Sequence, residues 1–427
     1  RGLDDTSSPD RLGRKPHRAG DREHLESWKD AHFGHLTCSR LTLKKVLITV
    51  VLLPIVGVGL WLYFRQRSLP DYGPAYREYA YVTNGKSNTV TVIDLRAFAP
   101  IKTIRVGSEP TGVAANNKKN EVYVVNTGSN NVSVIDAERN QVVATIGVQG
   151  RPYFIDVSTD GRRGYVANSG SANVSVIDLE KRTVLGNVRV GAAPGLAKVA
   201  PDGHTVVVSN RGDDTVSLLD ADRLNIRATL PVCRQPQDIA IVPDSSKAFV
   251  ACPDSAQVVS IDLKNGKLLT LLDVGRTPID LVLKPDGGEL IVCNFDSNNI
   301  SVIETTTNEV GSSYLIGEKP TRGVVTADNS RLYVSNFGSN TVAVYDIDLG
   351  RLIATIGVGS GPDALALLPS QNDLLVIDSQ SGDASVIHRN PNPKKFEREY
   401  YLLTMIPLGV QPNNVTIKAF RLTKSVK

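Results

Sequence analysis

A short motif, Tyr-Val-x-Asn, recurs every 42 residues and constrains the fold of this 427-residue chain more than any other feature. Its eight copies begin at Tyr81, Tyr123, Tyr165, Val207, Phe249, Ile291, Tyr333 and Leu375. The second residue is valine in every copy, as expected of a β-branched side chain packed in a strand. Repeats of about this length are typical of the blades of a β-propeller.

Each repeat contains four short segments with the two-residue alternation of β-strands. In one unit these segments are residues 112–115, 123–126, 132–136 and 142–146. Turn signals such as Pro201-Asp202-Gly203 separate the segments. Four antiparallel strands without a helical period predict one propeller blade for each repeat.

A proline opens the first strand of each unit. These prolines are Pro110, Pro152, Pro194, Pro236, Pro278, Pro320, Pro362 and Pro412. The first Tyr-Val-x-Asn motif has no such strand before it, and Pro412 has no motif after it. We therefore expect residues 413–419 to complete the blade that contains Tyr81, a Velcro-type closure that leaves no free edge. The predicted fold is all-β, an eight-bladed β-propeller of four-stranded blades over residues 79–419 with a tail at 420–427.

The segment before the repeats has a different character. Residues 1–45 are polar and mixed in charge, and they predict a tail that is flexible or ordered by a partner. Residues 46–64 contain no charge and are about long enough for a helix to cross a bilayer. A cleaved signal peptide is the alternative, but its apolar run would be shorter and would end in small residues. We predict an uncleaved transmembrane helix at 46–64 and a linker at 65–78.

The charges around this apolar run predict its orientation. Arg40, Lys44 and Lys45 precede it, while Arg65 and Arg67 follow it. This small excess favours a cytoplasmic N-terminus in the cytoplasmic membrane and a propeller in the periplasm or outside the cell. The formal net charge of +4 argues against a nucleic-acid partner.

Two cysteines depart from the repeat within one 42-residue interval. Cys233 stands where most other units have glycine, and Cys252 stands where they have asparagine or, once, Asp378. Both positions are strand ends that should lie on the same face. They could form a disulfide worth roughly 3 kcal/mol in an oxidising periplasm. Two independent buried thiols are the alternative.

The nearly intact motif Tyr-Val-x-Asn…Val-Ser-Val-Ile-Asp…Pro at 123–152 resembles the YVTN family of β-propeller repeat proteins. The resemblance covers about residues 79–419 and implies an exported or cell-surface protein. More distantly, the eight-blade count resembles the haem d1 domain of cytochrome cd1 nitrite reductases. That relative would imply a cofactor in the central funnel with axial histidine ligation. The repeats hold only His204, in a predicted turn, and His388, where other units have aspartate, and no Cys-x-x-Cys-His is present for covalent haem.

Candidate site residues come from three places. Asp238, Asp280 and Arg322 each lie two residues after a proline and could form a polar ring for an anion or a metal. Mutual charge compensation around a wet channel is the alternative. In the tail, His32, His35 and Cys38 are residue types that ligate metals, and they lie at short spacing. The alternative is that this segment is an ordinary helical approach to the membrane.

The third place is the loops around the recurring prolines. Phe295 and Phe337 follow the motif asparagine in adjacent units, where an aromatic residue suits an interface anchor. Cations of the same loops are Arg151, Arg234, Arg276, Lys319 and Arg322. The alternative is that each ring folds back onto the neighbouring blade.

The repeated asparagines and aspartates are interpreted as structural. Asparagines such as Asn126 should satisfy backbone N–H groups of a turn, and aspartates such as Asp136 should cap turns. We therefore predict a non-catalytic, membrane-anchored propeller that binds a membrane-associated protein, as an accessory subunit of a membrane complex, without a cofactor or metal. The alternative is an envelope enzyme or cofactor carrier, lactonase-like or haem d1-like, that uses the central funnel.

Overall fold

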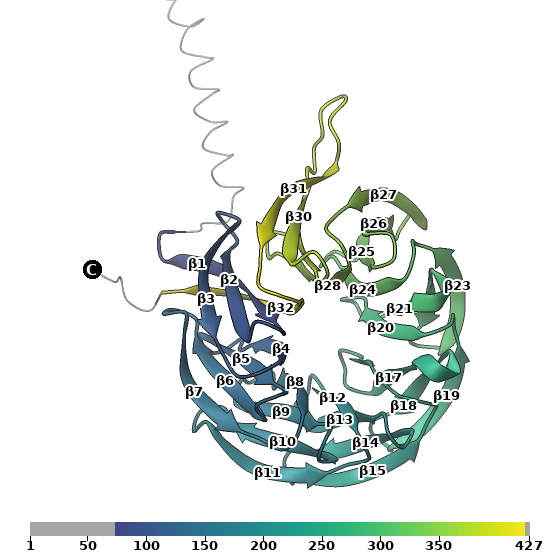
Figure 1. Ribbon diagram of the computed structural model, residues 1–427. Helices are drawn as coiled ribbons and strands as arrows, with labels where there is room; N and C mark the ends of the chain where they lie inside the picture. Colours follow the sequence, from purple (N-terminus) through teal and green to yellow (C-terminus); the bar gives the residue numbers. More distant parts are fainter. Residues whose placement is uncertain (1–72, 423–427) are drawn as a thin grey trace, which may run out of the picture. The chain divides into compact units, whose positions relative to one another are not determined.

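Every repeat folds into one four-stranded antiparallel sheet, and the eight sheets stand in a ring (Figure 1). The computed structural model describes residues 73–422. An eight-bladed propeller of four-stranded blades is therefore confirmed. The strands of a blade run from the ring centre outward, and we call them inner, second, third and outer.

The strand bounds follow the repeat closely. The inner strands are β4 (Pro110–Ala115), β8 (Pro152–Val157), β12 (Pro194–Val199), β16 (Ile239–Ile241), β20 (Pro278–Leu283), β24 (Pro320–Val325), β28 (Pro362–Leu367) and β32 (Pro412–Arg421). The second strands are β1 (Tyr76–Asn84), β5 (Glu121–Asn126), β9 (Arg163–Asn168), β13 (Thr205–Asn210), β17 (Lys247–Cys252), β21 (Glu289–Asn294), β25 (Arg331–Asn336) and β29 (Asp373–Asp378).

The other half of each blade is equally regular. The third strands are β2 (Thr89–Asp94), β6 (Asn131–Asp136), β10 (Asn173–Asp178), β14 (Thr215–Asp220), β18 (Gln257–Asp262), β22 (Asn299–Glu304), β26 (Thr341–Asp346) and β30 (Asp383–Arg389). The outer strands are β3 (Ala99–Arg105), β7 (Gln141–Gly147), β11 (Thr183–Arg189), β15 (Asn225–Pro231), β19 (Lys267–Asp273), β23 (Glu309–Leu315), β27 (Arg351–Gly357) and β31 (Tyr400–Pro407). Two 3₁₀ turns, η1 (Pro253–Ser255) and η2 (Phe295–Ser297), follow second strands.

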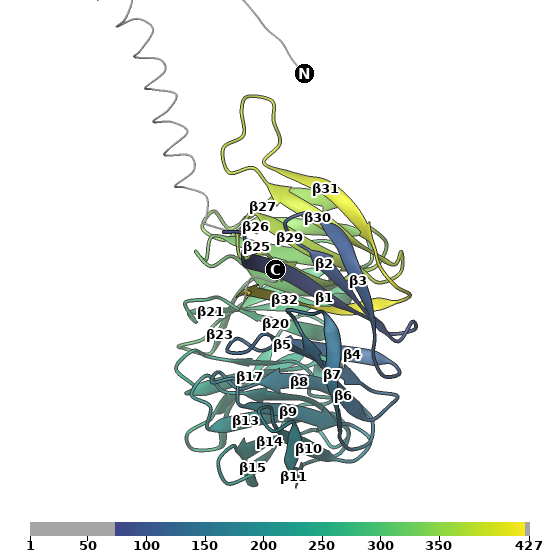
Figure 2. The same ribbon diagram turned by 90° about the vertical axis from the view of Figure 1, so that its left-hand side faces the viewer.

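The ring closes as predicted. β32 pairs antiparallel with β1, with Thr416 opposite Tyr81 and Asn414 opposite Thr83. Figures 1 and 2 show the yellow β32 beside the dark blue β1, although the two strands come from opposite ends of the described chain. The pairing extends to Arg421 opposite Tyr76, so the last inner strand is the longest of the eight.

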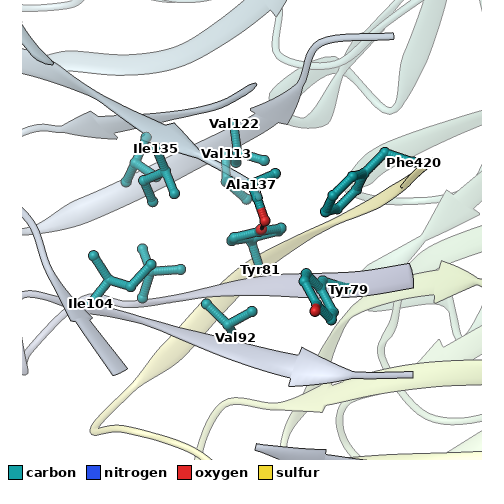
Figure 3. Close-up of a cluster of buried hydrophobic side chains, with 11 residues drawn as sticks. Tyr79, Tyr81, Val92, Ile104, Val113, Val122, Ile135, Ala137 and Phe420 are labelled. Atoms are coloured by element: carbon teal, nitrogen blue, oxygen red, sulfur yellow. Dashed lines mark hydrogen bonds between the residues drawn. The ribbon is translucent and has the colours of Figure 1, made fainter. Parts of the chain in front are cut away.

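The hydrophobic core lies between neighbouring blades. Because side chains alternate along a strand, each second strand packs against the blades on both of its sides. Tyr81 of β1 packs with Val122 and Ile135 of the next blade, whereas Val82 packs with Leu375 of the preceding one. Figure 3 shows the first of these clusters, with the ring of Tyr81 among side chains of both blades.

The motif asparagines tie the second strand to the third strand. The Nδ2 of Asn126 donates to Asn131 Oδ1 at 2.7 Å and to Ser133 Oγ at 2.9 Å. Equivalent pairs of bonds are made by Asn84, Asn168, Asn210 and Asn294. The expectation that these amides satisfy turn N–H groups is met at Asn84, whose Oδ1 accepts the backbone N–H of Gly409 at 3.1 Å. For Asn126 it is wrong, because its amide bonds across the sheet instead.

The recurring aspartates do cap turns. Asp136 Oδ1 accepts hydrogen bonds from the backbone N–H groups of Glu138 at 2.8 Å and Arg139 at 3.1 Å. The same carboxylate bonds occur in other blades, at Asp178 and Asp220. Each bond pair fixes the four-residue turn that joins a third strand to its outer strand.

A loop residue packs on the motif asparagine in most blades. A Cβ at Gly107 would lie 2.7 Å from the Cβ of Asn126, so this loop approach requires glycine. In the blade of β16–β19 the two corresponding residues are Cys233 and Cys252. They form a disulfide with their Cα atoms 5.7 Å apart, so a covalent bond stands where other blades have a glycine–asparagine contact.

Residues 73–422 contain no helix long and apolar enough to cross a membrane. The predicted transmembrane helix at 46–64 lies outside the described residues. The same is true of the tail at 1–45, with His32, His35 and Cys38, and of most of the linker at 65–78.

Candidate functional site

The inner strands surround a pocket of about 450 Å³ at the centre of the ring. Each blade contributes to its lining, which includes Thr111, Tyr153, Phe154, Asp156, Lys198, Asp238, Asp280, Arg322, Asp363 and Asn414. A groove of about 630 Å³ between β27 and β31 at the rim is larger, but it is lined by two outer strands and holds few charged groups. The central pocket is the better candidate because charged side chains from many blades converge there.

The structure brings the predicted residues Asp238, Asp280 and Arg322 together in this pocket. Arg322 Nη1 donates to Asp280 Oδ1 at 2.8 Å, a salt bridge between neighbouring blades. The other oxygen of Asp280 accepts the backbone N–H of Gly323 at 2.8 Å, and Asp238 accepts that of Leu281 at 2.8 Å. Part of the expected charge compensation is therefore present.

These carboxylates have a structural task because an inner strand is the edge of its sheet. Its channel-facing N–H groups need partners, and a side chain from the preceding blade supplies them. Asp156 shows the same arrangement, since its Oδ2 accepts the N–H of Val199 in the next blade at 2.9 Å. Three of the four acidic groups of the pocket are thus committed to the scaffold.

Two cations in the pocket region were not singled out from the sequence. Lys198 donates to the backbone oxygen of Ile239 at 2.8 Å and lines the main pocket. Arg211 lies over the ring of Tyr153, with its guanidinium carbon 5.1 Å from the ring centroid. No hydrogen bond to another residue within 73–422 holds the guanidinium of Arg211.

Arg211 and Arg322 meet in a side lobe of about 60 Å³. Tyr153, Gln237 and Asp238 complete its lining, and Tyr153, Asp238 and Arg322 also line the main pocket. A lobe lined by two arginines, one of them stacked over an aromatic ring, is suited to a carboxylate or phosphate. The signal in the sequence was weak, since Arg211 stands where other units carry glycine, threonine, serine, proline or phenylalanine.

Burial shifts the ionisable groups of this pocket. Burial raises the pKa of Asp280 and of Asp363, although Arg322 opposes the shift in each case. Burial also raises the pKa of Asp156. Burial alone would lower the pKa of Arg322, but Asp280 and Asp238 hold it above its ordinary value. Burial therefore opposes ionisation of these acids, whereas the neighbouring aspartates keep the Arg322 guanidinium charged.

The predicted interaction residues lie on the face that carries the loops before the prolines, which we call the proline face. Phe295 and Phe337 are both half-buried. Lys319 Nζ of the next blade lies 5.3 Å from the Phe295 ring centroid. The Phe337 ring lies 3.1 Å from where a Cβ on Gly361 of the next blade would stand. Each ring thus contacts the following loop, which is the alternative placement considered for them.

The loop cations are spread around the proline face. Arg234 donates to the backbone oxygen of Asp254 at 2.6 Å, and Arg276 donates to that of Asp296 at 3.1 Å. Arg151 occupies a left-handed conformation with φ of 50°, and its side chain is on the exposed loop before Pro152. Of the cations predicted for an interaction surface, Arg322 alone enters the described central pocket.

Neither histidine of the described region lines the central pocket. His204 is exposed and lies 2.8 Å from Asp222, while His388 on β30 lies 2.7 Å from Asp373. Among residues 73–422 no cluster of three or more histidine, cysteine, aspartate or glutamate side chains could hold a metal ion. Of the described residues that line the pocket, Tyr153 is the side chain of a type that commonly ligates haem iron.

Comparison with known proteins brings out one family. The family model of the Cytochrome D1 heme domain matches residues 116–327, just under half of the chain. No curated protein sequence matches the chain.

Solved structures share the fold. A dihydro-heme d1 dehydrogenase, NirN, in complex with DHE has a TM-score of 0.67 at 15% identity, covering 79% of this chain and 74% of that one. Hydrazine synthase of Kuenenia stuttgartiensis has a TM-score of 0.54 at 20% identity, covering 66% and 96%. A functionally unknown protein from Desulfotomaculum acetoxidans DSM 771 has a TM-score of 0.55 at 16% identity, covering 80% and 99%.

These findings correct the expected function. The match to the Cytochrome D1 heme domain contradicts a non-catalytic interaction scaffold, and it agrees better with the alternative of an enzyme or cofactor carrier that uses the central funnel. It also supports the more distant of the two resemblances seen in the sequence, and membership of the YVTN family is not shown.

Proposed function

We propose that this chain is a cofactor-binding or enzymatic propeller that holds a small organic anion in its central pocket. The observation that carries the proposal is the meeting of Arg211 and Arg322 beside Tyr153, in a lobe that shares residues with the central pocket. The match to a haem-binding family supports a ligand at this position of the fold.

The lobe would receive a carboxylate of the ligand, and the main pocket would receive its body. Arg322 donates one hydrogen bond to Asp280, and 45% of its side chain remains exposed. Phe154 and Leu196 add apolar surface, and Asn414 adds an amide to the lining. A pocket with apolar walls and a few placed polar groups is the usual form of a small-molecule site.

Haem d1 itself fits this lining only in part. Its peripheral carboxylates suit Arg211, Arg322 and Lys198, because guanidinium and ammonium groups pair with carboxylates. Its iron finds no histidine among the described residues of the pocket. The lining therefore supports a carboxylate-bearing ligand, and we derive no redox step through iron.

Asp363 is the remaining free acid of the pocket. Within residues 73–422 no hydrogen bond engages its carboxyl, and burial raises its pKa. A carboxyl group with a raised pKa and no partner of its own is better suited to exchange a proton or a hydrogen bond with a bound molecule than one committed to the scaffold. If the site is catalytic, Asp363 is the group that we expect to act as acid or base.

Binding experiments on the purified full chain test the proposal. The visible spectrum of the chain as isolated would show a bound tetrapyrrole directly. Calorimetric titration would then use three probes: haemin, metal-free protoporphyrin IX and succinate. We expect at least one probe to bind, and Arg211→Met to weaken that binding at least tenfold, with Arg276→Met on the proline face as the matched control.

Comparison of haemin with metal-free protoporphyrin IX shows which part of the ligand is recognised. Equal affinity for haemin and metal-free protoporphyrin would show that the carboxylates, and not the iron, are recognised. Failure of all three probes on a chain isolated without a ligand would overturn the proposal, as would unchanged affinity in both Arg211→Met and Arg322→Gln.

A further inference from the structure

One blade breaks the regularity of the ring with a protruding loop. Successive prolines are 42 residues apart up to Pro362, but Pro412 follows after 50. The extra residues lie in the loop at 390–399 between β30 and β31, where another blade has the four-residue turn 137–140. Figures 1 and 2 both show this loop projecting beyond the ring.

The loop is held in one shape by its own hydrogen bonds. Asn390 N–H donates to Glu399 O at 2.7 Å and closes its base. Glu397 Oε2 accepts from Lys394 N–H at 3.0 Å and from Asn390 Nδ2 at 3.2 Å. The insertion is therefore an ordered projection rather than a slack connection.

The loop presents an aromatic ring to solvent. Phe396 is 95% exposed, the highest value among the large apolar side chains of residues 73–422. Its φ of 77° lies in the left-handed region, which disfavours bulky residues. Phe396 therefore does not contribute to the hydrophobic core. Residues in such strained conformations cluster at functional sites, including ligand-binding sites.

The groups around the ring are cationic. Lys394, Lys395 and Arg398 are exposed, and Lys395 Nζ lies 5.4 Å from the Phe396 ring centroid. Both acids of the loop already accept hydrogen bonds. Glu397 accepts from the backbone of Lys394, and Glu399 accepts from Arg389 at 3.0 Å. An aromatic ring among free cations matches the chemistry of an anionic lipid surface.

The position of the loop agrees with that occupant. It joins a third strand to an outer strand, so it lies on the face opposite the proline face, and β1 begins on that same face in the adjacent blade. Only 11 residues separate Tyr76 from the predicted membrane span at 46–64. Such a segment reaches at most roughly 40 Å when fully extended.

We propose that the loop at 390–399 docks on the surface of an anionic bilayer, with Phe396 in the interface and Lys394, Lys395 and Arg398 on lipid phosphates. This contact would hold the face where β1 begins toward the membrane and leave the proline face turned away from it. The inference rests on the predicted span and is independent of the ligand in the central pocket.

Trypsin accessibility of the full chain in lipid nanodiscs tests the docking. Cleavage after Lys395 is measured by mass spectrometry in discs of phosphatidylcholine alone and in discs that also contain phosphatidylglycerol. We expect cleavage after Lys395 to be at least tenfold slower in the anionic discs. Cleavage after Arg276, on the proline face, serves as the internal standard and should not change.

Two variants sharpen the test. Phe396→Ser should abolish the protection of Lys395, whereas Leu315→Ser should retain it, because Leu315 is also 80% exposed but ends a strand on the proline face. Equal cleavage in both kinds of disc overturns the proposal, as does a chain that does not enter discs. Protection that appears only in native membranes and does not depend on anionic lipid would indicate a protein partner instead, and would also overturn it.

Discussion

The second strands and the inner strands of this propeller obey different rules. Along the second strands the motif valine is the same in all eight blades, and most motif asparagines make the same pair of bonds to the third strand. Along the inner strands only the opening proline is constant. The residue two places after it is Gly112, Phe154, Leu196, Asp238, Asp280, Arg322, Ala364 or Asn414.

This difference shows which strands of a repeat protein can carry ligand specificity. A second-strand position has similar neighbours in every blade, so the motif valine serves in all eight blades and the motif asparagine in six. Seven of these eight inner-strand residues line one shared channel, and eight copies of one charge there would repel each other. A site with cations, acids and an aromatic ring requires the copies to differ.

Removal of β32 should have the largest effect. Deletion of residues 411–427 leaves β1 with an unpaired edge and strips Phe420 from the first core cluster. We expect loss of a cooperative thermal transition and aggregation of the chain, measured by calorimetry and size-exclusion chromatography. A deletion of the exposed residues 391–398 is the control and should leave the transition intact. A monodisperse, cooperatively folding product of the larger deletion would contradict the closure.

The disulfide should contribute less. Replacing Cys233 and Cys252 together by alanine removes a link that closes 19 residues, and should cost about 3 kcal/mol of unfolding free energy. Cys233→Gly with Cys252→Asn restores the pair found in other blades and should cost less, because the asparagine can bond across the sheet again. Denaturant unfolding of the two double variants measures the difference, and equal losses would show that the repeat pair brings no packing of its own.

Replacement of Asp378 should have a smaller effect, and it should stabilise the chain rather than destabilise it. It occupies the motif asparagine position, is fully buried, and accepts from Ser385 Oγ at 2.7 Å. Burial raises the pKa of Asp378 to about 7, and nearby Asp383 adds to the shift. The folded state therefore binds more protons than the unfolded state between about pH 4 and pH 7, so this group's contribution to stability falls as pH rises through that window.

Asp378→Asn should remove that pH dependence and stabilise the chain by about 1–3 kcal/mol at pH 8, with little change at pH 4. Unfolding measured at both pH values checks the prediction. Asn336→Asp, which places a carboxyl at the same position of the preceding blade, should do the reverse. A stabilisation of equal size at pH 4 would mean that ionisation of Asp378 is not the cause.

The smallest effect on stability is expected in the channel. Arg211→Met keeps an apolar side chain over Tyr153 and loses only the charge, so unfolding free energy should change by less than about 0.5 kcal/mol. The same variant should lose most of the affinity for an anionic probe. A large loss of stability would place Arg211 among the scaffold residues, together with Asp156 and Asp280.

The repeat is enough to predict the architecture, because a blade is a local unit whose strands and turns are encoded within 42 residues. The 42-residue period predicted eight blades, and the unpaired halves at Tyr81 and Pro412 predicted the closure. Periodicity also carried the turn-capping role of Asp136. The bond partners of Asn126 did not follow, because they depend on which way the amide points across the sheet.

The residues that form the pocket are set by the way the blades are arranged around the ring. Arg211 and Arg322 belong to different blades, and the closed ring brings them into one lobe beside Tyr153. No spacing in the sequence predicts that the two arginines line one lobe, because Arg211 lies on a loop and Arg322 lies on an inner strand. The contact arises because all eight inner strands share one axis, so residues far apart along the chain become neighbours only when the ring closes.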